Sequence, residues 1–275
     1  MTSTTRRLHS QRTARIQPVL TGRDRRFLAS HVLITLLLLI LLSPIAQTTV
    51  LAAPRTTSED FAGLFDVGNG RKLFLECRGT GSPTVILEAG AGNNGQTWDT
   101  VGLPADMAQT AVLPGVASFS RVCVYDRPGT ILDLDQYSRS DPAPMPRTAS
   151  DIVADLHTLL TVASVPGPYV MAGHSFGGLV ARLYAATYPD DVAGLVLIDA
   201  AHEDYYEAQR AALTPEQQTE MAKLAAEGLP ELAGYLDFER LDTDASAGEL
   251  RESVSATPLR PMPAIVLTHG RPWDW

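Results

Sequence analysis

Short apolar runs alternate along the chain with longer segments whose apolar residues recur at the spacing of a helix. The runs have the length of buried strands, and glycine, proline or polar residues bound them. They cover residues 84–87, 121–125, 169–172, 194–199 and 264–268. Helical spacing is clear over residues 148–160 and 179–188. Strands that are apolar on both faces and separated by helices are typical of parallel sheets. The pattern therefore predicts an α/β fold, with a mostly parallel sheet flanked by helices.

The region ahead of these runs has a different pattern. Residues 64–67 and 72–77 are short strand-like segments, and Gly68-Asn69-Gly70 separates them. Such a turn between two strand-like segments predicts a β-hairpin. We therefore place the folded domain at residues 64–275 and a short polar linker at residues 54–63.

Residues 1–53 have the composition of a targeting segment. Seven arginines precede an apolar run from Val32 to Leu42, and small residues follow at Val50-Leu51-Ala52-Ala53. A basic region, an apolar region and a small-residue site are the three parts of a secretory signal. The alternative is a retained membrane anchor that crosses over Val32–Ala53 with its arginines inside. Both interpretations predict an exported domain, secreted or anchored, whose membrane contact is confined to this segment.

The charge of the remaining chain limits the class of partner. Residues 54–275 contain 15 basic and 30 acidic residues, a net charge of −15. This excess argues against a nucleic-acid partner and is typical of a solvated surface. Neither of the two cysteines belongs to a motif with metal-ligand spacing, so we predict no metal and no other cofactor.

The segment Gly173-His174-Ser175-Phe176-Gly177 lies between an apolar strand and a helix-period run. A strand, a sharp turn and a helix are the context that a G-x-S-x-G nucleophile elbow requires. The serine must stand on a strained turn, and small neighbours let the strand and the helix pack closely. The turn also places the Phe176 N–H at a helix N-terminus, where it can stabilise a developing oxyanion.

This elbow, followed at once by Gly178, resembles the α/β-hydrolase superfamily, and the resemblance runs from about Phe65 to the last residue. Gly90 and Trp98 also fit the family's spacing, although Ala89 stands where the family usually has histidine. The resemblance implies that Ser175 is the nucleophile and that the Ala91 and Phe176 amides form the oxyanion hole. The helical stretch of about residues 201–262 resembles the family's cap, which covers the pocket and selects the substrate.

A serine nucleophile needs a base and an acid that orients the base. The resemblance implies two positions for the acid, Asp274 after the last predicted strand and Asp199 after the preceding one, of which we prefer Asp274. The family's histidine follows one strand later, and none of the chain's histidines matches that position. They are His9, His31, His157, His174, His202 and His269. The resemblance therefore implies that the chain lacks the family's last strand, histidine and helix, which leaves the activity of this form in doubt.

The resemblance implies a serine hydrolase that acts through Ser175 on a small-molecule ester or another carboxylic substrate. Two alternatives remain open because a fold alone does not determine a function. One is a non-catalytic binding protein or an inactive gene fragment. The other is an acyltransferase or a cofactor-free haloperoxidase built on the same fold.

The resemblance also bears on the two cysteines. It implies that the second hairpin strand, which ends near Cys77, lies antiparallel to the strand that bears Cys123. Opposed residues of an antiparallel pair approach closely enough for a disulfide, and export would provide an oxidising compartment. The alternative is two buried thiols that pack as small apolar side chains.

Overall fold

The computed structural model describes residues 59–101, 109–227 and 237–270 of the chain. The chain divides into two units, residues 1–53 and residues 54–275, and all the described residues belong to the second. The predicted targeting segment and the candidate acid Asp274 therefore lie outside the described residues. In the described ranges, no helix combines the length and the apolar character needed to cross a membrane.

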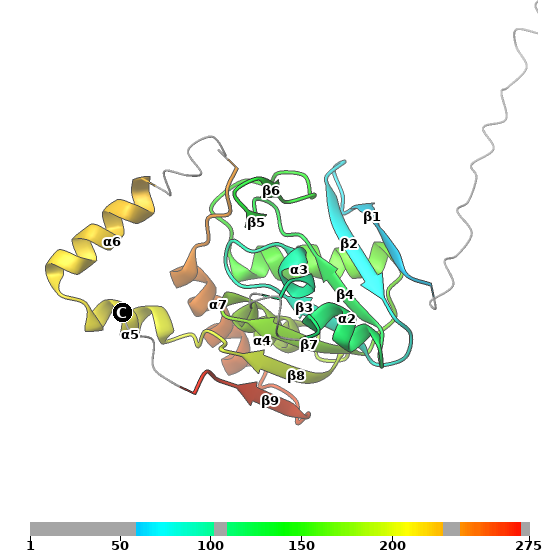
Figure 1. The fold of residues 1–275 in the computed structure, drawn as a ribbon. Coiled ribbons are helices and arrows are strands. Elements are labelled where there is room, and N and C mark those ends of the chain that lie inside the picture. The colour runs from blue at the N-terminus through cyan, green and yellow to red at the C-terminus, as the bar shows by residue number, and fades with distance from the viewer. Residues whose placement is uncertain (1–58, 102–108, 228–236, 271–275) are drawn as a thin grey trace, which may run out of the picture. The chain divides into compact units, whose positions relative to one another are not determined.

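A seven-stranded sheet forms the centre of the second unit (Figure 1). Its strands lie in the order β1-β2-β4-β3-β7-β8-β9. The two pairs that involve β2 are antiparallel, and the remaining neighbours are parallel. Their bounds are β1 Phe61–Asp66, β2 Lys72–Arg78, β3 Thr84–Glu88, β4 Val122–Tyr125, β7 Tyr169–His174, β8 Val192–Ile198 and β9 Ala264–Leu267. A small separate ribbon pairs β5 (Ile131–Asp133) with β6 (Gln136–Tyr137).

Helices cover both faces of this sheet, which confirms the predicted α/β class. The helices of the described ranges are η1 Gly95–Asp99, α2 Val112–Ala117, α3 Ala149–Val162, α4 Phe176–Thr187, α5 Tyr205–Ala212, α6 Pro215–Glu227 and α7 Thr243–Ala256, of which α5 and α6 project away from the sheet (Figure 1). Successive strand residues point to opposite faces. Ile86 accordingly packs with residues of α3 and α4, whereas Leu87 packs with Trp98 of η1 and Leu113 of α2. The sheet thus has one apolar core on each side.

Two boundaries differ from the sequence-based expectations. Strand β1 begins at Phe61, where it pairs with Cys77, so the domain starts inside the segment expected to be a linker. The ring of Phe61 contacts Phe65 and lies under the Arg121 guanidinium, which ties this segment to the sheet. Helix α7 buries Ala247 and Leu250 and packs against α3 and α4, whereas α5 buries no residue. Within the expected cap of residues 201–262, α7 therefore belongs to the layer on the sheet.

Cys77 and Cys123 form a disulfide, which confirms the pairing that the resemblance allowed. The two residues lie directly opposite each other in the antiparallel pair of β2 and β4, with their Cα atoms 4.1 Å apart. Both side chains are fully buried. The bond fastens the hairpin β1–β2 to the parallel part of the sheet.

Candidate active site

Ser175 occupies a strained turn between β7 and α4. Its backbone has φ 51° and ψ −124°, a left-handed region that costs free energy for a residue with a side chain. The surrounding backbone holds the turn in place: the Ser175 N–H donates to Ile198 O at 3.1 Å, and the Ser175 carbonyl accepts from Gly178 and Ala201. The residue therefore has the local geometry of a nucleophile elbow.

The glycines around Ser175 allow main-chain segments to approach closely. A Cβ atom at Gly173 would lie 2.3 Å from the carbonyl oxygen of Gly177. A Cβ atom at Gly177 would lie 2.5 Å from the carbonyl oxygens of Glu88 and Ala89. No side chain fits at either position, so the start of α4 can lie directly against the end of β3.

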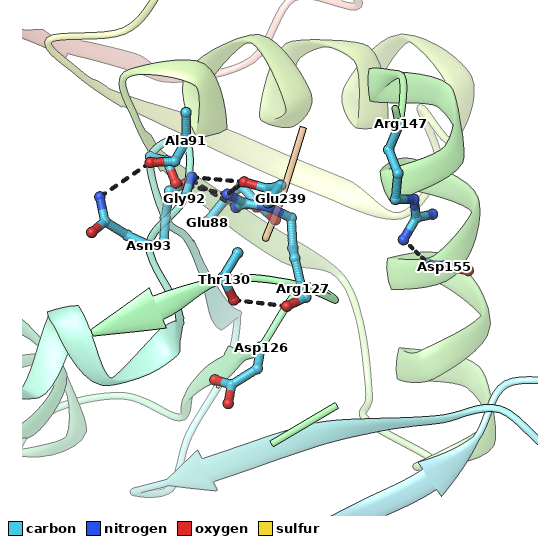
Figure 2. A network of polar contacts seen from close by, with 12 residues as sticks. Glu88, Ala91, Gly92, Asn93, Asp126, Arg127, Thr130, Arg147, Asp155 and Glu239 are labelled. Atoms are coloured by element: carbon cyan, nitrogen blue, oxygen red, sulfur yellow. Dashed lines mark hydrogen bonds and ion pairs between the residues drawn. The ribbon is translucent and has the colours of Figure 1, made fainter. Parts of the chain in front are cut away.

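The loop of residues 89–92, which we call the oxyanion loop, follows β3 and lies beside Ser175. A Cβ atom at Gly90 would lie 3.4 Å from Ser175 Cβ and 3.0 Å from His174 Nδ1. The predicted oxyanion donors lie on the two segments that meet here: Ala91 in this loop and Phe176 at the N-terminus of α4. Figure 2 shows the loop beside a buried ionic network that contains Glu88, Arg127 and Glu239.

Asp199 and His269 form a close pair at the carboxyl ends of β8 and β9. The carboxylate oxygen Oδ1 of Asp199 lies 2.7 Å from His269 Nδ1 and accepts from the His269 backbone N–H at 2.7 Å. The hydrogen bond from the His269 side chain, reinforced by that from its backbone, lowers the pKa of Asp199. The carboxylate is therefore ionised where it meets the imidazole.

His269 does not occupy the family's histidine position, so the resemblance assigns it no role. One signal could have found it: His269 and Asp199 each follow a predicted parallel strand. Those strands are neighbours in the sheet, with Ile198 paired to Leu267. Residues just past the ends of adjacent parallel strands meet at the same edge, as these two do.

One cavity of about 870 Å³ brings Ser175, Asp199 and His269 together. Tyr205 of α5 also contributes to its wall, so the expected cap reaches this cavity. The other lining residues are His174, Arg182, Leu197, Ala200, Ala201, His202, Val266 and Thr268. Among the described residues, no group of three or more His, Cys, Asp or Glu side chains is placed to hold a metal ion.

The comparisons with known proteins agree on the family. Residues 85–275 match the model of the Alpha/beta hydrolase family. The chain is 38% identical over 104 residues to lipase LipV of Mycobacterium tuberculosis, a match that covers 36% of this chain and 39% of the lipase. It is 29% identical over 147 residues to an AB hydrolase superfamily protein of Gibberella zeae, covering 50% of this chain and 40% of that protein.

Solved structures show the same fold at lower identity. Mouse alpha/beta hydrolase domain-containing protein 10 superposes with a TM-score of 0.52 and 20% identity, covering 76% of this chain and 77% of the mouse chain. The chain spans less than half the length of the curated relatives it matches, from 15% to 43%.

Proposed function

Because the chain belongs to the alpha/beta hydrolase family, we propose that it is a serine hydrolase that cleaves a small ester or another carboxylic substrate. One observation carries the proposal: an elbow serine and an aspartate–histidine pair line the same cavity. A nucleophile, a base and a group that orients the base are the parts that acyl transfer requires.

In the proposed mechanism, Ser175 attacks the substrate carbonyl and His269 accepts the hydroxyl proton. Asp199 holds the Nδ1 side of the imidazole, so proton transfer falls to Nε2. The Ala91 and Phe176 amides stabilise the oxyanion of the tetrahedral intermediate. His269 then returns the proton to the leaving alcohol, and water hydrolyses the acyl-enzyme. Asp199 takes the orienting role in this scheme, in preference to Asp274.

A fluorophosphonate probe tests the identity of the nucleophile. We expect the 275-residue chain to be labelled covalently at one site and Ser175→Ala to be unlabelled. Ser120→Ala is the matched control, because Ser120 donates to Pro83 O and does not line the cavity. Peptide mapping of the adduct identifies the modified residue.

The same probe can refute parts of the proposal separately. Undiminished labelling of Ser175→Ala would refute the nucleophile. A second result would be that the probe labels only a chain to which the family's C-terminal strand and histidine have been added. That result would refute His269 as the base but would leave Ser175 as the nucleophile.

We further propose that the domain functions after export. The basic and apolar composition of residues 1–53 and the disulfide between Cys77 and Cys123 support this, because disulfides persist in oxidising compartments. Mass spectrometry of the protein from its native host should find either an N-terminus near Pro54 or an intact arginine-rich start in the membrane fraction. Full-length chain recovered in a soluble cytoplasmic fraction would contradict both fates.

A further inference from the structure

The guanidinium of Arg127, which follows β4, has all five of its N–H bonds directed at acceptors. Nε donates to Glu239 at 2.6 Å. Nη1 donates to Glu88 at 2.6 Å and to the carbonyl of Ala89 at 2.8 Å. Nη2 donates to the carbonyl of Gly90 at 2.7 Å and to Glu239 at 2.9 Å. Arginine has five such donors, so this side chain is saturated, and two of its bonds hold the oxyanion loop.

The two carboxylates that flank Arg127 are themselves fixed. Glu88 accepts from the Tyr125 hydroxyl at 2.7 Å, and Glu239 accepts from the Gly92 N–H at 2.7 Å. The side chains of Arg127, Glu88 and Glu239 are at most 3% exposed. Burial lowers the pKa of Arg127, but Glu239 and Glu88 outweigh it and raise that pKa, so the guanidinium remains charged.

The hydrogen bond from Arg127 to the Gly90 carbonyl determines the orientation of the peptide group between Gly90 and Ala91. The Gly90 carbonyl and the Ala91 N–H belong to one planar trans peptide, in which C=O and N–H point in opposite directions. Arg127 Nη2 donates to that carbonyl oxygen, which therefore faces the buried network of Arg127, Glu88 and Glu239. The Ala91 N–H is therefore directed to the opposite side of that peptide. Gly90 lies against His174 and Ser175, so this peptide is a neighbour of the nucleophile.

We propose that Arg127 is a positioning residue that, by holding the Gly90 carbonyl, keeps the Ala91 N–H oriented as an oxyanion donor for Ser175. This inference rests on the proposed function. The Gly90 carbonyl also accepts from the Asn93 N–H at 3.2 Å, so without Arg127 only this longer turn bond holds the peptide. A peptide that rotates would place a carbonyl where the N–H was, and that carbonyl would repel the oxyanion. Catalysis would then fail at the transition state, although substrate would still bind.

The same guanidinium joins the oxyanion loop to the segment that follows α6. Glu239 belongs to that segment, and its N–H donates to Gly129 O at 2.8 Å. A Cβ atom at Gly129 would lie 2.2 Å from Asp237 O, so the two main chains are in contact. The segment that returns from the cap thus takes part in orienting the oxyanion donor.

Steady-state kinetics with p-nitrophenyl acetate separate positioning from plain stabilisation. Lysine keeps the charge but has three donors, so Arg127→Lys cannot satisfy the five acceptors. We expect its kcat to fall on the order of 10²–10³-fold, the usual effect of losing one oxyanion donor, with KM nearly unchanged. Arg71→Gln is the matched control, because Arg71 is a partly buried arginine paired with Asp155. This control should lower the thermal midpoint and leave kcat unchanged.

A spectroscopic readout tests the peptide without relying on turnover. The dipeptide Gly-Ala occurs once in the chain, at Gly90-Ala91. Labelling the full chain with [13C′]glycine and [15N]alanine therefore gives one carbonyl–nitrogen cross-peak. We expect this peak to move in Arg127→Lys and in Arg127→Gln, and to stay in place in Arg71→Gln. In the wild type it should also move downfield when a fluorophosphonate occupies Ser175.

The outcomes distinguish this inference from the proposed function. Wild-type hydrolysis by Ser175→Ala would overturn the function, while the cross-peak would still report the peptide orientation. An inactive Ser175→Ala together with a normal kcat in folded Arg127→Lys would overturn the positioning role alone. A cross-peak at the wild-type position in both Arg127 variants would also overturn it. The glutamine variant gives a second chance to obtain folded protein.

Discussion

Ser175 and the oxyanion loop lie at the carboxyl ends of the central strands β7 and β3, whereas Asp199 and His269 follow β8 and the edge strand β9. Around Ser175, the side chains of Met171, Phe176 and Leu179 are fully buried. The side chains of His269 and Asp199 are 40% and 28% exposed. The two halves of the candidate site therefore depend on different physical support.

The central half is held by packing and by the saturated ionic network around Arg127. The contacts that fix its geometry therefore also stabilise the fold. The edge half is held chiefly by the hydrogen bonds between Asp199 and His269, which follow β8 and β9. All four residues of β9 are exposed, including Ile265 at 56% and Val266 at 64%. We infer that substitutions at the edge should change chemistry with little effect on folding, whereas substitutions near the centre should affect folding first.

The largest expected effect comes from the edge pair. His269→Gln should slow labelling of Ser175 by a fluorophosphonate about 10²–10⁴-fold, since that is the usual contribution of a general base. The midpoint of urea unfolding should stay within experimental error of the wild type. His202→Gln is the matched control, because His202 lines the same cavity but lies near Glu203 and Asp204. Equal labelling of the two variants would contradict the assignment.

Removing the disulfide should produce the second-largest effect, this time on folding. Cys77 and Cys123 are separated by 46 residues, so constraint of the unfolded chain contributes about 4 kcal/mol to stability. Cys77→Ala/Cys123→Ala should lose about that free energy of unfolding in urea titrations without reductant. Labelling of the folded fraction should keep its wild-type rate. If the double variant lost labelling of Ser175 but kept the stability of the wild type, the expected difference between the centre and the edge would be wrong.

A matched pair of isoleucines measures the contrast in packing directly. Ile86 on β3 is 1% exposed, whereas Ile265 on β9 is 56% exposed. Ile86→Val should cost about 0.5–1.5 kcal/mol of unfolding free energy because it opens space in a packed core. Ile265→Val should have almost no effect. Equal costs in thermal or urea unfolding would show that the β9 edge is packed in solution.

The smallest expected effect is a change in the free energy of unfolding at low pH. His269 lowers the pKa of Asp199, so the ionised carboxylate stabilises the fold at pH values above the ordinary aspartate range. This contribution is lost as the pH falls through the lowered folded-state pKa. Wild type should therefore be slightly more stable than Asp199→Asn near neutral pH, and the two should converge in acid. Asp135→Asn, which alters an exposed aspartate in the turn between β5 and β6, controls for the change in net charge.

The sequence by itself determined the features that depend on local physics. The apolar runs predict buried strands, the helical spacing over residues 148–160 predicts α3, and both are present. Gly173 and Gly177 indicate a turn at which no side chain fits, and the structure places Ser175 in that turn. Such features are readable because they depend on residues only a few positions apart.

Only the tertiary structure decided which distant residues meet. Cys77 faces Cys123 because of the register between β2 and β4, which the resemblance left open. His269 reaches Asp199, 70 residues away, because β9 lies beside β8. Glu239 reaches Arg127 across 112 residues from a segment without helical or strand periodicity. No local sequence pattern therefore predicts this ion pair. Sheet order, strand register and loop docking are set by the packing of the whole domain, and that packing brings these distant residues together.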